Sequence, residues 1–243
     1  MKKANKGFTL VELLVVIGIL GILMGTLYPA ISSALADTSM KTFAMNGRKI
    51  VQGIIQVNTD RQAKGKTSVW PHNKTEDGLS DDNQDIAGKP FSSATDYFKE
   101  LFDIEHQTSS DQWQPYIEGY EASWLAGAGV PPAQPGNLQK ENVAWTVAKG
   151  FTDDLGDFLP VLVSRNANTD TFAKSSTYNS NDMTERITLG ETYAQPFGKK
   201  GCVIVTKGGG ADTYKARDSR PKDIYKSNSF TIPTGVEVSY IEP

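Results

Sequence analysis

The first 36 residues of the chain are dominated by one long apolar run. From Phe8 to Tyr28 the side chains are apolar or small except for two threonines and Glu12, and the apolar character continues to Ala36. A helix needs about 20 such residues to cross the hydrocarbon core of a bilayer. The run therefore predicts a membrane-spanning helix over residues 8–36. The lysines ahead of it, Lys2, Lys3 and Lys6, favour a cytoplasmic location for that end.

Beyond the run, apolar residues recur at alternating steps of four and three, with polar and basic residues between them. They are Ala36, Met40, Phe43, Gly47, Ile50, Ile54 and Val57. This spacing predicts an amphipathic helix that continues the first one over residues 37–62. The polar residues Asn58-Thr59-Asp60 predict that the regular helix ends near Val57.

Residues 63–243 alternate between short apolar segments and turn residues, which is typical of a globular head. One short helix is predicted over residues 93–102, behind a serine cap. Strands are predicted at residues 142–148, 158–164, 202–207, 213–215, 229–232 and 235–241. The predicted fold class is therefore α+β: a long N-terminal helix, apolar in its first half, whose amphipathic half packs on a small antiparallel sheet.

Composition excludes several classes of function. The formal net charge is −3, so the chain is not a generally basic nucleic-acid binder. The single cysteine, Cys202, cannot form an internal disulfide, and two histidines, His72 and His106, offer little for a zinc site. We find no nucleophile–base pair, P-loop or dinucleotide motif, and we expect no enzymatic activity.

Glu12 is the unusual residue of the apolar run, because an unpaired carboxylate in a bilayer is unfavourable and usually functional. An ordinary signal peptide, cleaved after the small residues of Ala34-Leu35-Ala36, would not explain it, and neither would a simple anchor. Cleavage after Gly7 would explain it, because the new amine of Phe8 would lie four residues before Glu12. The two charges could pair within one helix or between staggered subunits.

The sequence Gly7-Phe8-Thr9-Leu10-Val11-Glu12, followed by the apolar run and Pro29, resembles the N-terminus of type IV pilins and type II secretion pseudopilins. The resemblance implies that a prepilin peptidase removes residues 1–7 and methylates the amine of Phe8. It also implies a single-pass inner-membrane precursor that polymerises with copies of itself or related subunits, through an inner-membrane assembly platform. The product would be a periplasmic or cell-surface filament, in which Glu12 neutralises the Phe8 amine of a neighbour.

Several alternatives stay open at this stage. The resemblance does not separate a surface pilus from a secretion pseudopilus, or a major subunit from a minor one. A different class of protein, a periplasmic binding or enzymatic domain exported by signal cleavage after Ala36, is the main competitor. Gly18, Gly21, Gly25 and Pro29 either let helices pack closely or mark a segment that can kink.

Two charged segments of the head were considered as binding sites. Asp81, Asn83 and Asp85 have the spacing of the first ligands of a calcium loop, but Ile86 and Ser92 replace the glycine and glutamate that such a loop needs. We interpret this segment as a solvated loop rather than a metal site. We also interpret the basic run as a solvated surface rather than a nucleic-acid site, because aspartates are mixed in; its residues are Tyr214, Lys215, Arg217, Arg220, Lys222, Tyr225 and Lys226.

Overall fold

The computed structural model describes residues 8–71, 86, 91–102, 116–134, 136–170, 172, 177–178, 186–225, 230–231 and 238–243. The chain divides into two compact units, Met1–Thr38 and Ser39–Pro243. Helix α1, Leu10–Ala63, contributes to both units. The second unit is called the head below.

Helix α1 ends at Ala63, one residue past the continuation expected over residues 37–62 but six residues beyond the end near Val57 that residues 58–60 predicted, and this second boundary was wrong. Thr59 is accommodated inside the helix because its hydroxyl donates to the carbonyl of Ile55 at 2.9 Å. The helix ends at Ala63, two residues before Gly65, whose φ of 68° is a left-handed conformation that favours glycine. The amides of Gly65 and Lys66 donate back to Gln62 and Arg61 at 3.0 and 2.9 Å, which is a Schellman motif.

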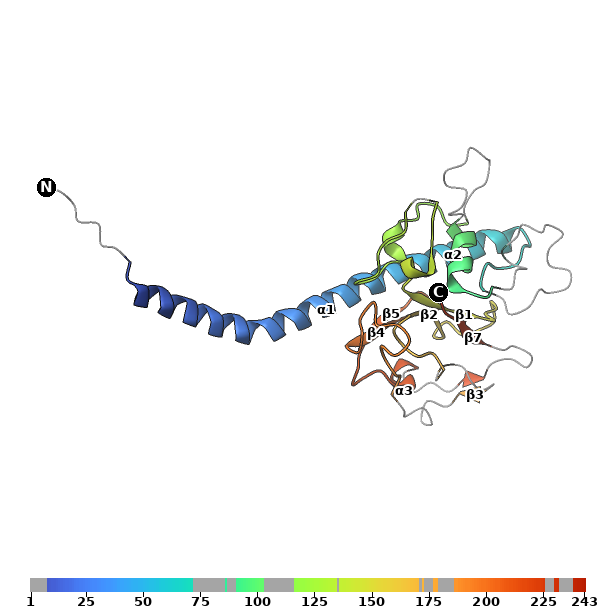
Figure 1. Ribbon diagram of the computed structural model, residues 1–243. Coiled ribbons are helices and arrows are strands. Elements are labelled where there is room, and N and C mark those ends of the chain that lie inside the picture. The colour runs from blue at the N-terminus through green and yellow to red at the C-terminus, as the bar shows by residue number, and fades with distance from the viewer. Residues whose placement is uncertain are drawn as a thin grey trace. The chain divides into compact units, whose positions relative to one another are not determined.

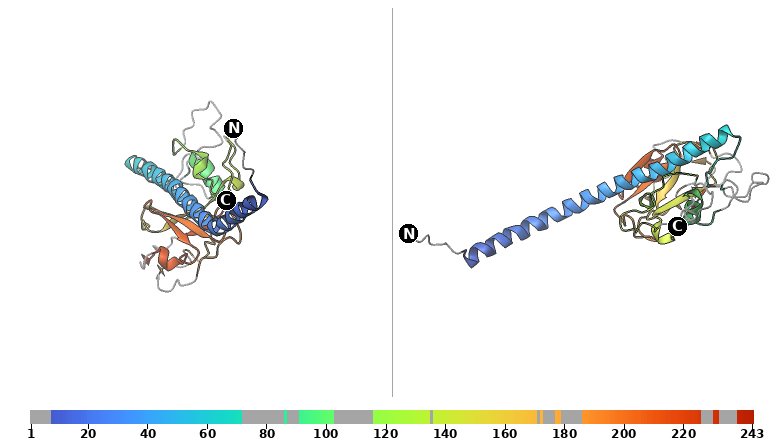
Figure 2. Two further views of the ribbon diagram at one scale, coloured as in Figure 1. Left: turned by 90° about the vertical axis from the view of Figure 1, so that its left-hand side faces the viewer. Right: turned by 90° about the horizontal axis from the view of Figure 1, so that it is seen from above.

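Within the head, one face of α1 is buried, as the sequence pattern predicts. The buried residues are Met40, Phe43, Ala44, Gly47, Ile50, Val51 and Ile54. Ala44 and Val51 widen the predicted stripe, whereas Ala36 and Val57 are only half-buried. The head part of α1 lies along the sheet in the views of Figures 1 and 2.

The main sheet has five strands in the order β5-β4-β2-β1-β7, and its pairs are antiparallel. The strands are β1 (Trp145–Lys149), β2 (Pro160–Ser164), β4 (Gly201–Thr206), β5 (Ala211–Lys215) and β7 (Ser239–Ile241). The α+β fold is therefore confirmed (Figure 1). The predicted strand at 142–148 begins late, because Lys140–Asn142 forms the 3-10 helix η4.

The remaining elements of the described structure are short, and they include the 3-10 helix η3 (Ala122–Trp124). Helix α2 (Ala94–Phe102) matches the predicted helix, and the amide of Ala94 donates to the carbonyl of Glu242 at 2.8 Å. Strands β3 (Thr177–Tyr178) and β6 (Phe230–Thr231) form a separate two-stranded sheet, of which only β6 was predicted. Helix α3 (Pro221–Ile224) was not predicted and starts with proline at its first position.

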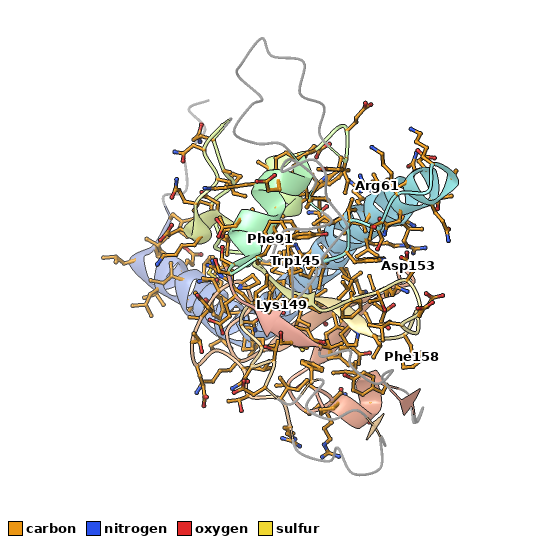
Figure 3. The ribbon with its side chains drawn as sticks, turned by 90° about the vertical axis from the view of Figure 1, so that its right-hand side faces the viewer. Arg61, Phe91, Trp145, Lys149, Asp153 and Phe158 are labelled. Carbon is orange, nitrogen blue, oxygen red and sulfur yellow. The ribbon has the colours of Figure 1, made fainter. Side chains whose placement is uncertain are left out.

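Aromatic packing fixes α1 on the sheet at Phe43 and Trp145. Their rings stack at a centroid distance of 3.8 Å with an interplanar angle of 9°, and both side chains are buried. Figure 3 labels Trp145 within the head. One turn along the helix, a Cβ atom on Gly47 would lie 2.6 Å from two ring carbons of Trp145. Glycine therefore allows the helix backbone to approach β1.

Candidate functional site: the N-terminal part of α1

The apolar side chains of α1 before the head are exposed to solvent. Their exposed fractions run from 45% at Val16 to 82% at Leu10. A Cβ atom added to Gly18, Gly21 or Gly25 would meet nothing within 4 Å. In the part of the chain that the structure describes, no side chain covers this surface. Helix α1 is long and apolar enough to cross a membrane, judged by length and composition.

Glu12 has hydrogen-bond partners within its own chain. Thr9 precedes the first helical residue, and its amide and hydroxyl donate to Oε2 of Glu12 at 2.8 and 2.7 Å. The amide of Glu12 donates in return to the Thr9 hydroxyl at 3.3 Å. This reciprocal pair is a capping box, which satisfies amides that a helix start leaves free.

The capping box adds a structural role for Glu12 that our reading of the sequence missed. The signal was present, because Thr9-Leu10-Val11-Glu12 has the Ser/Thr-x-x-Glu spacing of a capping box. The partner that the sequence predicts for Glu12 is the amine of Phe8. Phe8 is 73% exposed in the unprocessed chain, where its nitrogen belongs to a neutral peptide bond.

Pro29 lies inside α1, as the sequence analysis placed it. It has no amide hydrogen, so the carbonyl of Gly25 receives no helical hydrogen bond from it. Three residues earlier, the hydroxyl of Thr26 donates to the carbonyl of Leu23 at 3.0 Å. Pro29 is therefore a local weak point in the backbone hydrogen bonding of the apolar segment.

Other predicted sites lie outside the described residues. Gly7 and the calcium candidates Asp81, Asn83 and Asp85 are among them, and so are both histidines. Their assignments stay predictions. Among the residues that are described, no group of three or more histidine, cysteine, aspartate or glutamate side chains is placed to hold a metal ion.

The basic run near the C-terminus is partly described. Tyr225 is buried and Tyr214 is half-buried against the core, so neither ring is a free platform for a nucleic-acid base. Nε of Arg217 lies 3.2 Å from a carboxylate oxygen of Asp218, and both side chains are exposed. The side chain of Lys222 and the whole of Lys226 lie outside the description.

Cys202 is buried in β4, as its apolar strand suggests. Burial raises the pKa of its thiol to about 12, because the interior disfavours the thiolate. The thiol is therefore a poor nucleophile near neutral pH.

Comparisons with known proteins point to the same N-terminal segment. Residues 2–28 match a protein-family model described as the prokaryotic N-terminal methylation motif. Two curated proteins from Neisseria gonorrhoeae, both described as type IV major pilin protein PilE1, are 36% identical to the chain over 91 residues. The match covers 37% of this chain and 50% or 46% of the relative.

The chain thus spans about half the length of the curated relatives it matches. No solved structure gave a significant match. The chain carries the prokaryotic N-terminal methylation motif at residues 2–28 and is similar in sequence to type IV major pilins.

Proposed function

We propose that the chain is a structural subunit of a type IV pilus or of a type II secretion pseudopilus. The observation that carries the proposal is the methylation motif on a helix whose apolar surface is exposed from Phe8 to Leu35. Such a surface is unfavourable in water, at about 25 cal/mol for each Å² of apolar area. Lipid would cover it before assembly, and equivalent helices of other subunits would cover it afterwards.

Processing comes first in this proposal. A prepilin peptidase cuts between Gly7 and Phe8 at the cytoplasmic face and methylates the new amine. The cut creates a positive charge on the amine of Phe8, four residues before Glu12. It leaves Thr9 in place, so the capping box of the precursor can persist in the mature chain.

Glu12 then has two roles that follow one another. In the free subunit, Thr9 supplies hydrogen bonds to the carboxylate, which lowers the cost of its position near the membrane edge. In the filament, the Phe8 amine of a neighbouring subunit pairs with the carboxylate. A charge pair in an apolar setting is favourable only with good geometry, so it also fixes the stagger between subunits.

The mature subunit stays in the inner membrane as a single-pass protein until it is transferred to the assembly platform. It ends in a periplasmic or cell-surface filament. Pro29 and the three glycines provide the segment in which the helix can deform during that transfer.

The alternative function is an exported periplasmic binding or enzymatic domain, cut by signal peptidase after Ala36. One observation favours it: the head begins at Ser39 and its first buried residue is Met40. A cut after Ala36 would therefore leave the packed residues of the head intact. The sequence of the mature N-terminus separates the two proposals.

Filament recovery tests the main proposal. Cells expressing the wild-type chain should release filaments on shearing, and Glu12→Ala should leave membrane insertion and cleavage intact but abolish filaments. Glu118→Ala, which removes an exposed carboxylate from the head, is the matched control and should assemble normally. Normal filament recovery from the Glu12→Ala variant would refute the assembly role of Glu12.

A further inference from the structure

The face of α1 that points away from the core of the head is basic. Lys41, Met45, Arg48 and Lys49 follow one another at helical spacing, and all four are exposed. We call these four residues the basic face. From Thr38 to Thr59 the chain has three basic residues and no acidic residue.

The basic face has no charged partner among the described residues of its own chain. No ion pair is found there for Lys41 or Arg48, and the Nζ of Lys49 lies 5.3 Å from the centroid of the Trp124 ring. Met45 is 64% exposed, whereas the other large apolar side chains in the described part of the head are buried or half-buried. The basic face therefore presents three cations and one exposed apolar side chain, to which a surface of opposite charge would be complementary.

A second surface of the head has the opposite charge. The turn between β1 and β2 carries three exposed aspartates and the half-buried Phe158, and its members are Asp153, Asp154, Asp157 and Phe158. We call these four residues the acidic turn. Figure 3 labels Asp153 and Phe158 at the same margin of the head.

Lys207 stabilises the acidic turn by hydrogen bonds to its backbone. Its Nζ donates to the carbonyls of Asp153 and Leu155 at 2.7 and 2.6 Å, and it lies 5.9 Å from the centroid of the Trp70 ring. The indole of Trp70 also donates to Oδ1 of Asp153 at 3.2 Å. The ammonium also interacts electrostatically with Asp153, Asp154 and Asp157, and three carboxylates against one ammonium leave this turn with a net negative charge.

We propose that the basic face of α1 docks on the acidic turn of a second copy of this chain. The two surfaces match in kind: three cations around an exposed methionine face three carboxylates beside a half-buried phenylalanine. Because the two surfaces are different patches of one chain, the contact is heterologous, and a heterologous contact whose rotation does not close into a ring generates an open helical filament. The inference rests on the proposed function and specifies which head surfaces meet in the filament.

Cysteine cross-linking tests the contact directly in assembled filaments. A full-length chain with Met45→Cys and Asp154→Cys should give a ladder of disulfide-linked multimers after mild oxidation, whereas each single variant should stay monomeric. The native Cys202 is buried and does not compete. Filaments of the double variant that yield no multimers would overturn the proposal.

Charge reversal provides a second, independent arm. Arg48→Glu with Lys49→Glu, or Asp154→Lys with Asp157→Lys, should each lower the yield of sheared filaments by about 5- to 30-fold, from roughly 1–2 kcal/mol over two surface pairs. Combining all four changes should restore the yield. Lys140→Glu, at an exposed lysine outside both surfaces, should have no effect.

The outcomes separate this inference from the proposed function. If the wild-type chain forms filaments but the variant with all four charge reversals does not recover the filament yield, the docking contact is refuted. The proposed filament function is not affected by that result. A charge reversal without any loss would likewise refute only the docking contact. No filaments from the wild-type chain, together with no cross-linked multimers from the double cysteine variant, would refute both.

Discussion

Replacing Phe43 by alanine should destabilise the head far more than any substitution on the exposed face of α1. Phe43 is 2% exposed, stacks on Trp145 at 3.8 Å, and meets the ring of Phe197 edge-on at 5.4 Å. Truncating a buried phenylalanine removes its transfer free energy and leaves a cavity, which together cost about 3–5 kcal/mol of unfolding free energy. For a domain of this size, that corresponds to a Tm lowered by roughly 6–20 °C.

The matched control is Met45→Ala, two residues along the same helix. Met45 is exposed, so its truncation should change the unfolding free energy by no more than about 0.5 kcal/mol. Thermal unfolding of the full chain in detergent, followed by tryptophan fluorescence, measures both variants against wild type. Equal Tm values for the two variants would refute the claim that the second half of α1 is part of the core of the head.

Two further predictions concern Glu12 and Cys202. Glu12→Gln keeps an oxygen that can accept hydrogen bonds from Thr9 but loses the charge. The helix content measured by circular dichroism should therefore be unchanged, whereas filaments should be lost. A filament yield equal to that of wild type would mean that Glu12 is only a helix cap. The buried thiol of Cys202 has a pKa of about 12 against 9.0 for an ordinary thiol. The unfolded state therefore loses this proton first, so the unfolding free energy should fall as pH rises from about 9 to about 12. Urea titrations should show a shallower fall for Cys202→Ala, and identical slopes would contradict the assignment.

Much of the fold could be predicted because it depends on regular periodicity. The four–three spacing from Met40 to Ile54 predicted the buried face of α1, and the apolar residues 158–164 predicted strand β2, which the structure places at the centre of the sheet. Boundaries were less accurate because they depend on single hydrogen bonds. The helix continues past Asn58, with the hydroxyl of Thr59 bonded to the carbonyl of Ile55, and it ends at Ala63, just before Gly65 adopts a positive φ.

The candidate site was predictable in part for the same reason. The apolar run and Glu12 are visible in the sequence. The spacing of the capping box is visible too, if Thr9 is taken as the residue that caps the start of the helix. The acidic turn could not have been predicted, since its shape depends on contacts with Trp70 and Lys207, which lie far away in the sequence. The two-residue strands β3 and β6 are too short to give a periodic signal.

The mass of the N-terminal peptide of the mature protein tests the central claim most directly. The account predicts a peptide that begins at Phe8 and carries one methyl group on its amine, in protein recovered from membranes or filaments. A mature chain beginning at Asp37, or an unprocessed chain in assembled material, would contradict it.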